Sequence, residues 1–273
     1  HLVLGDLHYE NIDSTDPARF VDAYGRALST PAQSALARQA PTAYVWDDHD
    51  YGPNDADASF VGRAASRAAY RAAVPHYPVT PGDAPINQAF TIGRVRFVLT
   101  DQRSEHTADT MLGEAQKAWL LDELRTSSRS HALVVWVNSV PWIGPVSPGS
   151  DNWTGQPAER TEIADVIATE GIDNLLMLSG DAHMLAIDDG TNSDYSTTGG
   201  AGFPLFHTAA LDRPGSVKGG PYSEGAIPGF GQFGVVEFVD DGGPSITVRL
   251  SGRNWHDEEL LAYEHTFAVP SLG

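Results

Sequence analysis

Cysteine is absent from this sequence, and its absence removes two classes of structure. Neither a disulfide bond nor a thiolate metal site can form within the chain, so metal ligands are left to His, Asp, Asn and Tyr side chains. The absence of cysteine does not decide the cellular compartment.

Positive charge is scarce as well. The chain carries 17 Lys and Arg against 36 Asp and Glu, a formal net charge of −19. Such a surface repels polyanions, so we expect no binding to duplex nucleic acid. An anionic substrate would need a local positive centre, which bound cations could supply.

Long apolar runs are also missing. No stretch approaches the roughly 20 apolar residues that a membrane span requires, so no transmembrane segment is expected. Hydrophobic residues make up 41% of the 273 positions, which is enough for a sizeable core. No signal peptide is visible, and the chain opens in what reads as a core strand. We therefore expect a single domain over residues 1–273 that lacks an N-terminal segment.

What the sequence does contain is three apolar runs that each end in acidic and histidine residues. One Gly-Asp after a strand is usually only a turn, and four consecutive ionisable residues could form a solvated loop. Three such clusters in one chain instead favour a metal-bearing rim at the carboxyl edge of a sheet. The clusters occupy residues 5–9, 47–50 and 180–183.

Apolar periodicity predicts both helices and strands. Strands alternate with helices in the middle of the chain and hairpins lie towards the end, which fits a layered α/β/β/α arrangement better than a strictly parallel sheet. We expect Arg63, Arg67 and Arg71 to form a solvated helix face, and residues 201–231 to wrap the surface near the site. Helices are expected near 16–28, 30–40, 59–74, 113–124 and 158–170, and hairpins at 88–100 and 233–250.

An ordered set of short motifs makes the chain recognisable. Each motif is weak alone, but together they resemble the PhoD-like alkaline phosphatases, a branch of the calcineurin-like metallophosphoesterases. The motifs are Gly5-Asp6-Leu7-His8-Tyr9, Trp46-Asp47-Asp48-His49-Asp50, Asp101-Gln102-Arg103, residues 112–120, Asn138-Ser139-Val140-Pro141, Asp151-Asn152-Trp153, Pro157-Ala158-Glu159-Arg160 and Gly180-Asp181-Ala182-His183.

The resemblance implies a fold and a metal centre. The fold would be the metallophosphoesterase-type α/β/β/α four-layer sandwich, with two mixed sheets flanked by helices. The metals would be iron and calcium, with zinc, manganese or magnesium as alternatives. The family also has an earlier ligand motif, which we expect this chain to lack. The implied ligands are Asp6 as a bridge, Tyr9 and His183 on oxidised iron, and Asp48, Asn138 and Asp181 on calcium.

These residues predict metal-dependent hydrolysis of phosphate monoesters, diesters or both, by metal-activated water at a multinuclear centre. His49 would lie near the leaving oxygen or the attacking water, with Asp50 holding its orientation. Arg103 and Arg160 are either phosphate partners or structural ion pairs, and both interpretations stay open here. The substrate would be a small-molecule, lipid or polymer phosphate ester, and the resemblance implies export to the periplasm or beyond.

Two other functions remain open at this point. The first is a catalytically inactive binding protein that keeps the metallophosphatase fold around an incomplete metal site. The second is a metal-independent hydrolase that uses Ser139 or Ser179, although neither lies in a Gly-x-Ser-x-Gly elbow. His207 stands between apolar residues and is expected to be a hydrogen-bonded core histidine. The natural substrate and the oligomeric state are not predicted.

Overall fold

The computed structural model describes residues 1–270, and its largest element is a seven-stranded mixed sheet. Four neighbouring strands, β4, β5, β6 and β8, run parallel, whereas β3 and β7 run antiparallel to their neighbours. The strands, in their order across the sheet, are β3 (Gln88–Ile92), β4 (Val95–Leu99), β5 (Leu133–Asn138), β6 (Leu175–Ser179), β8 (Leu205–Thr208), β7 (Met184–Asp188) and β9 (Gly225–Pro228).

The second sheet layer consists of two small sheets. β1 (Leu2–Leu4) and β2 (Ala43–Val45) form a parallel pair, whereas β10 (Gln232–Val239), β11 (Ser245–Asn254) and β12 (Glu259–Ala268) form an antiparallel meander. The predicted four-layer α/β architecture is confirmed. The second sheet layer differs from the prediction because it consists of two separate sheets and not of one mixed sheet. The last three strands are consecutive in the chain and pair with each other through short turns.

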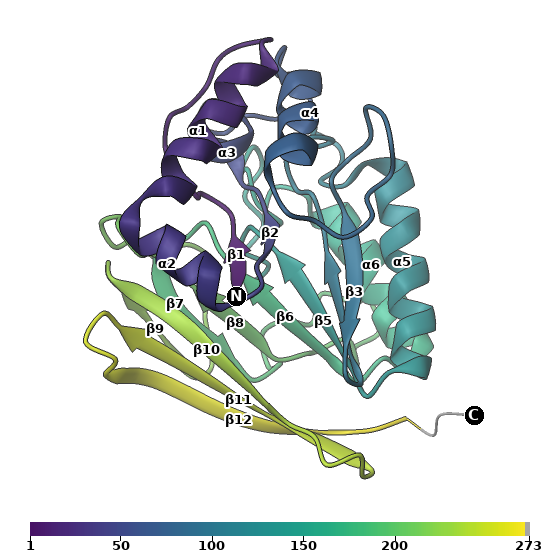
Figure 1. The fold of residues 1–273 in the computed structure, drawn as a ribbon. Helices are drawn as coiled ribbons and strands as arrows, with labels where there is room; N and C mark the ends of the chain where they lie inside the picture. Colours follow the sequence, from purple (N-terminus) through teal and green to yellow (C-terminus); the bar gives the residue numbers. More distant parts are fainter. Residues whose placement is uncertain (271–273) are drawn as a thin grey trace.

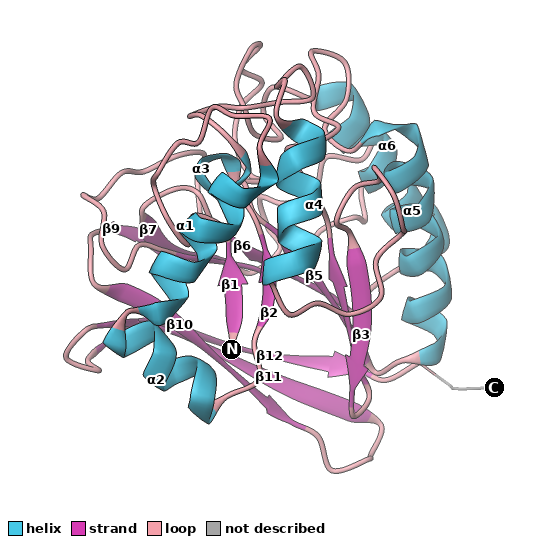
Figure 2. Ribbon diagram, turned by 45° about the horizontal axis from the view of Figure 1, so that its top comes forward, coloured by secondary structure: helices cyan, strands magenta, loops and turns pink. Residues whose placement is uncertain are grey.

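Helices cover the outer face of the large sheet and the β1–β2 pair, whereas no helix of residues 1–270 covers the outer face of the β10–β12 meander (Figure 1, Figure 2). α5 and α6 pack on the large sheet through one apolar core, and α1 and α4 pack over β1 and β2 through the core that separates the two sheet layers. No helix within residues 1–270 combines the length and the apolarity that crossing a bilayer would require. The helices are α1 (Pro17–Ser29), α2 (Pro31–Gln39), α3 (Asp48–Tyr51), α4 (Arg63–Ala73), α5 (Gly113–Ser130) and α6 (Pro157–Glu170).

Local sequence signals account for most of these elements. Asp16 caps α1 by accepting a hydrogen bond from the amide of Ala18, and Pro17 occupies the first helical position, as expected. Both predicted hairpins are confirmed. The region 201–231 differs from the prediction because it contains β8 and β9, and most of β8 is buried inside the sheet. Strands of four residues are too short to give a clear periodic signal.

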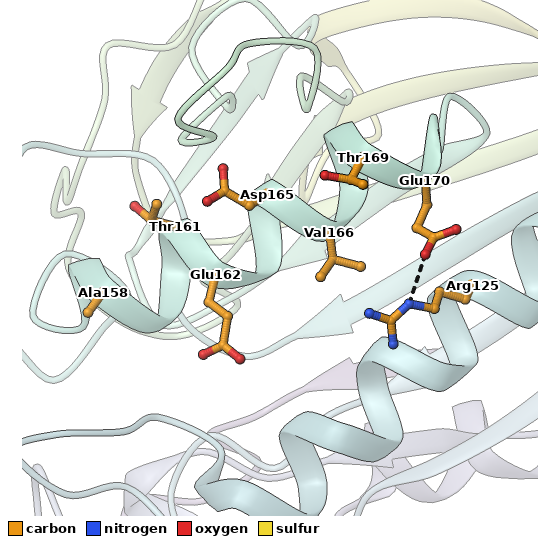
Figure 3. A pocket seen from close by; sticks show the side chains of 8 residues that line it. All are labelled: Arg125, Ala158, Thr161, Glu162, Asp165, Val166, Thr169 and Glu170. Atoms are coloured by element: carbon orange, nitrogen blue, oxygen red, sulfur yellow. Dashed lines mark hydrogen bonds and ion pairs between the residues drawn. The ribbon is translucent and has the colours of Figure 1, made fainter.

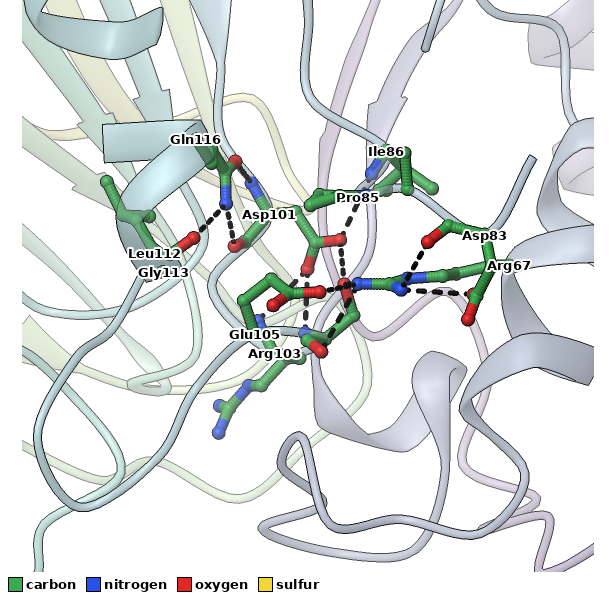
Figure 4. A network of polar contacts seen from close by, with 12 residues as sticks. Arg67, Asp83, Pro85, Ile86, Asp101, Arg103, Glu105, Leu112, Gly113 and Gln116 are labelled. Atoms are coloured by element: carbon green, nitrogen blue, oxygen red, sulfur yellow. Dashed lines mark hydrogen bonds and ion pairs between the residues drawn. The ribbon is translucent and has the colours of Figure 1, made fainter. Parts of the chain in front are cut away.

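The arginine face of α4 is not solvated at its centre, so this prediction was wrong for Arg67. Its side chain is 1% exposed, forms an ion pair with Asp83 at 3.0 Å and contacts Glu105 and Ser104. Figure 4 shows the guanidinium reaching into this network of loop residues. The helix face is covered because the segments that follow β4 and precede β3 fold over it and accept hydrogen bonds from Nη1 and Nη2 of the guanidinium.

An open groove lies between α5 and α6, where Arg125 donates to Glu170 at 3.1 Å (Figure 3). Glu162 and Asp165 also line it. None of the predicted catalytic, metal-binding or substrate-binding residues lies in this groove, so the search for a site turns to the ends of the strands.

We predict that Arg67→Ala lowers the free energy of unfolding by about 2 kcal/mol, because the change leaves Glu105 and Ser104 without their partner. The loss is smaller than for a fully buried ion pair because both acidic partners reach solvent. Urea denaturation measures it. The matched control is Arg63→Ala on the same helix, which should change stability by no more than about 0.5 kcal/mol. Equal stability of the two variants would contradict the prediction.

Candidate metal centre

The three acidic and histidine clusters meet where strands of both sheet layers end. The carboxyl ends of β1, β5 and β6 approach so closely that Gly180 has no room for a side chain. An added Cβ there would lie 2.5 Å from the carbonyl oxygen of Leu4 and 3.1 Å from that of Ser139. Glycine at this position therefore allows the two layers to present their side chains to one another.

Tyr9, Asp6 and His183 form the first part of the centre. The Tyr9 hydroxyl donates to Asp6 Oδ2 at 2.8 Å and lies 3.3 Å from His183 Nε2. The other ring nitrogen of His183, Nδ1, lies 2.8 Å from the carbonyl oxygen of Pro214, which assigns the ring proton to Nδ1. Nε2 is then left with its lone pair towards the centre, the form in which an imidazole binds a metal ion.

Asp48 belongs to two groups of potential ligands. One ligand atom each from Asp6, Asp48 and His49 lie within 4.8 Å of one another, and the same holds for Asp48, Asp55 and Asp151. Asp48 therefore links two neighbouring groups that could each hold a cation. Asp55 and Asp151 were not predicted as ligands. Asp55 lies in a turn with φ 58°, and its amide donates to Asp48 Oδ2 at 2.6 Å. No periodic pattern marks such a contact.

The charges of the centre fit a bound cation. Asp6 Oδ1 and Asp47 Oδ2 are buried and have no hydrogen-bond partner among residues 1–270. Burial raises the pKa of Asp6, and the carboxylates of Asp47, Asp50 and Asp48 raise it further. Burial also raises the pKa of Asp47, against the opposing effect of Arg103. Negative charge is therefore in excess, and carboxylate, imidazole and phenol donors suit a metal ion.

Two of the predicted calcium ligands are engaged elsewhere. The Asn138 amide oxygen accepts from Trp153 Nε1 at 3.0 Å, and its amide nitrogen donates to the carbonyl oxygen of Val140. Both oxygens of Asp181 accept from Lys218 Nζ, at 2.7 and 2.9 Å. Asn138 therefore supports the fold directly, and calcium binding by Asn138 and Asp181 stays a prediction.

The two predicted phosphate arginines are also occupied. Arg103 is fully buried, donates to Asp47, and donates to Asp151 at 3.0 Å. Arg160 donates to two backbone carbonyl groups, and its guanidinium carbon lies 3.5 Å from the centroid of the Tyr195 ring. Of the two roles left open by the sequence, the contacts of Arg103 match the structural one. Arg160 is likewise held by internal contacts, although not by an ion pair.

His49 lies at the centre, but Asp50 does not orient it. The His49 ring contacts Asn11 through Nδ1 and packs against Tyr9, with ring centroids 4.1 Å apart and the ring planes tilted by 37°. Asp50 is buried and accepts from the amide of His8 at 3.1 Å and from that of Asp47 at 3.3 Å. The expectation for Asp50 fails because α3 begins directly after Asp47, so the Asp50 side chain turns back to cap the helix.

The sequence did not identify the loop between β8 and β9 as the source of two cations at this centre. Besides Lys218, the loop contributes Arg213, whose guanidinium carbon lies 3.3 Å from the centroid of the Tyr9 ring. The expectation that residues 201–231 wrap near the site indicated the segment but no individual residue. His207, in β8, is a core histidine as predicted: its Nε2 lies 2.8 Å from the carbonyl oxygen of Ala182, and burial lowers its pKa to about 4.

Comparisons with known proteins bear on the family and the fold. The family model of the PhoD-like phosphatases matches residues 8–222. Alkaline phosphatase D of Bacillus subtilis (strain 168) is 26% identical over 182 residues, which are 52% of this chain and 31% of that protein. The match thus spans less than a third of that relative's length.

Two solved structures share the fold. PhoD superposes with a TM-score of 0.68 at 15% sequence identity, covering 100% of this chain and 67% of that one. The purple acid phosphatase PPD1 from yellow lupin (Lupinus luteus) seeds has a TM-score of 0.57 at 15% identity, covering 97% and 45% of the two chains.

We predict that the metal-free protein is less stable at about pH 8 than at about pH 5. The pKa values of Asp6 and Asp47 are higher in the folded chain than the ordinary carboxyl values of the unfolded chain. At a pH between the ordinary and the raised pKa values, the folded chain therefore binds more protons than the unfolded chain. The free energy of unfolding therefore falls as pH rises through that window. Denaturant titrations of chelator-treated protein measure the effect, and an added divalent cation should stabilise the protein more at the higher pH.

Variants separate this effect from other titrations. Asp6→Asn and Asp47→Asn should each reduce the pH dependence, whereas Asp122→Asn, on the exposed face of α5, should leave it unchanged. Metal-free protein that gains stability from about pH 5 to about pH 8 would show that the buried carboxyls do not behave as described.

Proposed function

The chain belongs to the PhoD-like phosphatase family, and on that basis we propose that it hydrolyses phosphate esters with the help of bound metal ions. The observation that carries the proposal is the contact of Tyr9 with both Asp6 and His183, beside the buried Oδ1 of Asp6, which has no hydrogen-bond partner among residues 1–270. A set of phenol, carboxylate and imidazole donors with excess negative charge is suited to holding cations. The comparisons give no support to the alternative of an inactive binding protein.

The proposed metals are iron and calcium. Asp6, Tyr9 and His183 would hold iron, because a phenol with an imidazole and a carboxylate suits a ferric ion better than calcium. Asp48 would hold the calcium ion with oxygen ligands, for which Asp55 and Asp151 are candidates beside the predicted Asn138 and Asp181. When bound, the cations would supply positive charge for the phosphoryl oxygens and lower the pKa of a water molecule.

His49 would move the proton in this reaction. Burial lowers its pKa, so the ring is neutral at neutral and alkaline pH. With Nδ1 held by Asn11, the proton lies on Nδ1, and Nε2 can accept a proton from water or pass one to the leaving oxygen. The contact of His49 with the tilted Tyr9 ring restrains the imidazole beside the same carboxylates that would hold the cations.

Substrate and location belong to the same proposal. We propose a small-molecule, lipid or polymer phosphate ester as substrate, because cations bound at the centre would supply the local positive charge that a phosphate group requires in a protein with a net charge of −19. Export to the periplasm or the outside of the cell is proposed by family resemblance alone. Neither proposal depends on a partner protein.

The deciding experiment combines elemental analysis with the hydrolysis of an aryl phosphate monoester and diester. We expect stoichiometric metal, turnover that a chelator abolishes, and recovery when iron and calcium are restored. Turnover that survives complete metal removal would refute the metal mechanism and favour a serine hydrolase. Bound metal without turnover would favour the inactive binding protein.

The two histidines should separate binding from proton transfer. We predict that His183→Ala loses bound metal and activity together, whereas His49→Ala retains metal and loses about 10² to 10⁴-fold in kcat. Metal content and kcat measured on the same samples distinguish the cases, and circular dichroism checks that both variants fold. If His49→Ala also lost its metal, His49 would be a ligand and not a proton-transfer group.

A further inference from the structure

Arg213 is a cation without an acidic partner in a protein whose formal net charge is −19. Within residues 1–270 it forms no ion pair and donates no hydrogen bond, although it lies at a cluster of carboxylates. Its guanidinium carbon lies 3.3 Å above the Tyr9 ring, and the side chain is half-buried. The two arginines predicted to bind phosphate, Arg103 and Arg160, bond to the protein through most of their donors, and the remaining nitrogens, Arg103 Nη2 and Arg160 Nε, are buried.

The position of Arg213 relative to the centre is well defined. The loop that carries it is tied to His183 by three contacts: Pro214 through its carbonyl oxygen at 2.8 Å, and Ser216 through its amide at 3.0 Å and its hydroxyl at 3.2 Å. The guanidinium lies over the ring of Tyr9, and the hydroxyl of the same tyrosine contacts both Asp6 and His183. Arg213 is therefore positioned both by the bonds of its loop to His183 and by the contact of its guanidinium with Tyr9.

Stacking on an aromatic ring uses the face of a guanidinium and leaves its five N–H donors in the plane free. Those donors match two oxygens of a phosphate group in a planar, bidentate arrangement. Lys218 is placed differently, because its ammonium group already neutralises Asp181. Arg103 keeps one unpaired nitrogen, Nη2, but it is buried 3.8 Å from Asp48. Among the cations of residues 1–270 at the centre, Arg213 is thus the one that is partly exposed and has no ion pair and no donated hydrogen bond.

We propose that Arg213 binds the phosphate group of the substrate and favours phosphate monoesters over diesters. The proposal rests on the hydrolysis proposed above. A monoester carries up to two negative charges on its phosphate group and a diester carries one, so an added positive charge stabilises the bound monoester more. The monoester also offers three terminal oxygens, which leaves two for the guanidinium while another faces the cations.

Direct binding of inorganic phosphate by the metal-loaded protein tests the proposal without requiring turnover. Isothermal titration calorimetry at a pH where phosphate is mainly a dianion should show a Kd raised about tenfold or more in Arg213→Gln. The matched control is Arg19→Gln on the exposed face of α1, which removes the same charge away from the centre and should change Kd less than about twofold. Arg213→Lys keeps the charge but loses the planar fork, so part of the affinity should return.

Turnover provides the second measurement. In Arg213→Gln the ratio of kcat/KM for an aryl phosphate monoester to that for the diester should fall about tenfold, with unchanged metal content. Wild-type protein that binds phosphate through Arg213 but hydrolyses neither ester would refute the proposed hydrolysis and leave phosphate binding by Arg213 supported. Wild-type affinity in both Arg213 variants, or no phosphate binding by the wild type, would overturn the proposal.

Discussion

The buried guanidinium of Arg103 is the constraint on which the candidate site depends. It projects from the end of β4 in the large sheet, pairs with Asp47 beyond β2 in the second layer, and reaches Asp151 in the loop that follows β5. Asp48 lies 3.8 Å from it. Burying these charges is costly, and it is stable only because the guanidinium has several anionic partners. The result is a frame that joins both sheet layers and fixes the position of Asp47 beneath the centre before any cation binds.

Arg103 offsets only part of the negative charge gathered above it. Lys218 neutralises Asp181, while the buried oxygen of Asp6 has no partner among the described residues. The remaining carboxylates attract cations and repel phosphate, so cation binding has to precede or accompany substrate binding. Arg213 then lies on the solvent side of Tyr9, where its charge can act on an incoming anion. The positive groups of this region therefore extend from the buried Arg103 to the partly exposed Lys218 and Arg213, in a protein whose net charge is negative.

Sequence patterns predicted most of the helices and strands and the clusters that meet at the candidate site, but they did not predict β8, β9 or the direction of several side chains. Capping by Asp16 and Pro17 and the apolar runs that end in acidic clusters are local signals, and each was read correctly. The role of Asp50 could not be read in that way, because it depends on α3 beginning at the next residue after Asp47. Asn138 likewise turns towards Trp153, a partner brought in by the long loop after β5. Such contacts are tertiary, and periodicity carries no information on them.

Sheet topology explains why a residue as distant in the sequence as Arg213 reaches Tyr9. β8 enters the sheet between β6 and β7 and runs parallel to β6, so both strands deliver the chain to the same edge. The chain leaving β8 therefore passes His183, which follows β6, and is bonded to it before returning to the sheet in β9. Had β8 paired antiparallel to β6, the same loop would have emerged at the opposite edge. The four-residue strand that periodicity failed to reveal is thus the element that brings the Arg213 guanidinium to the edge where the candidate metal centre lies.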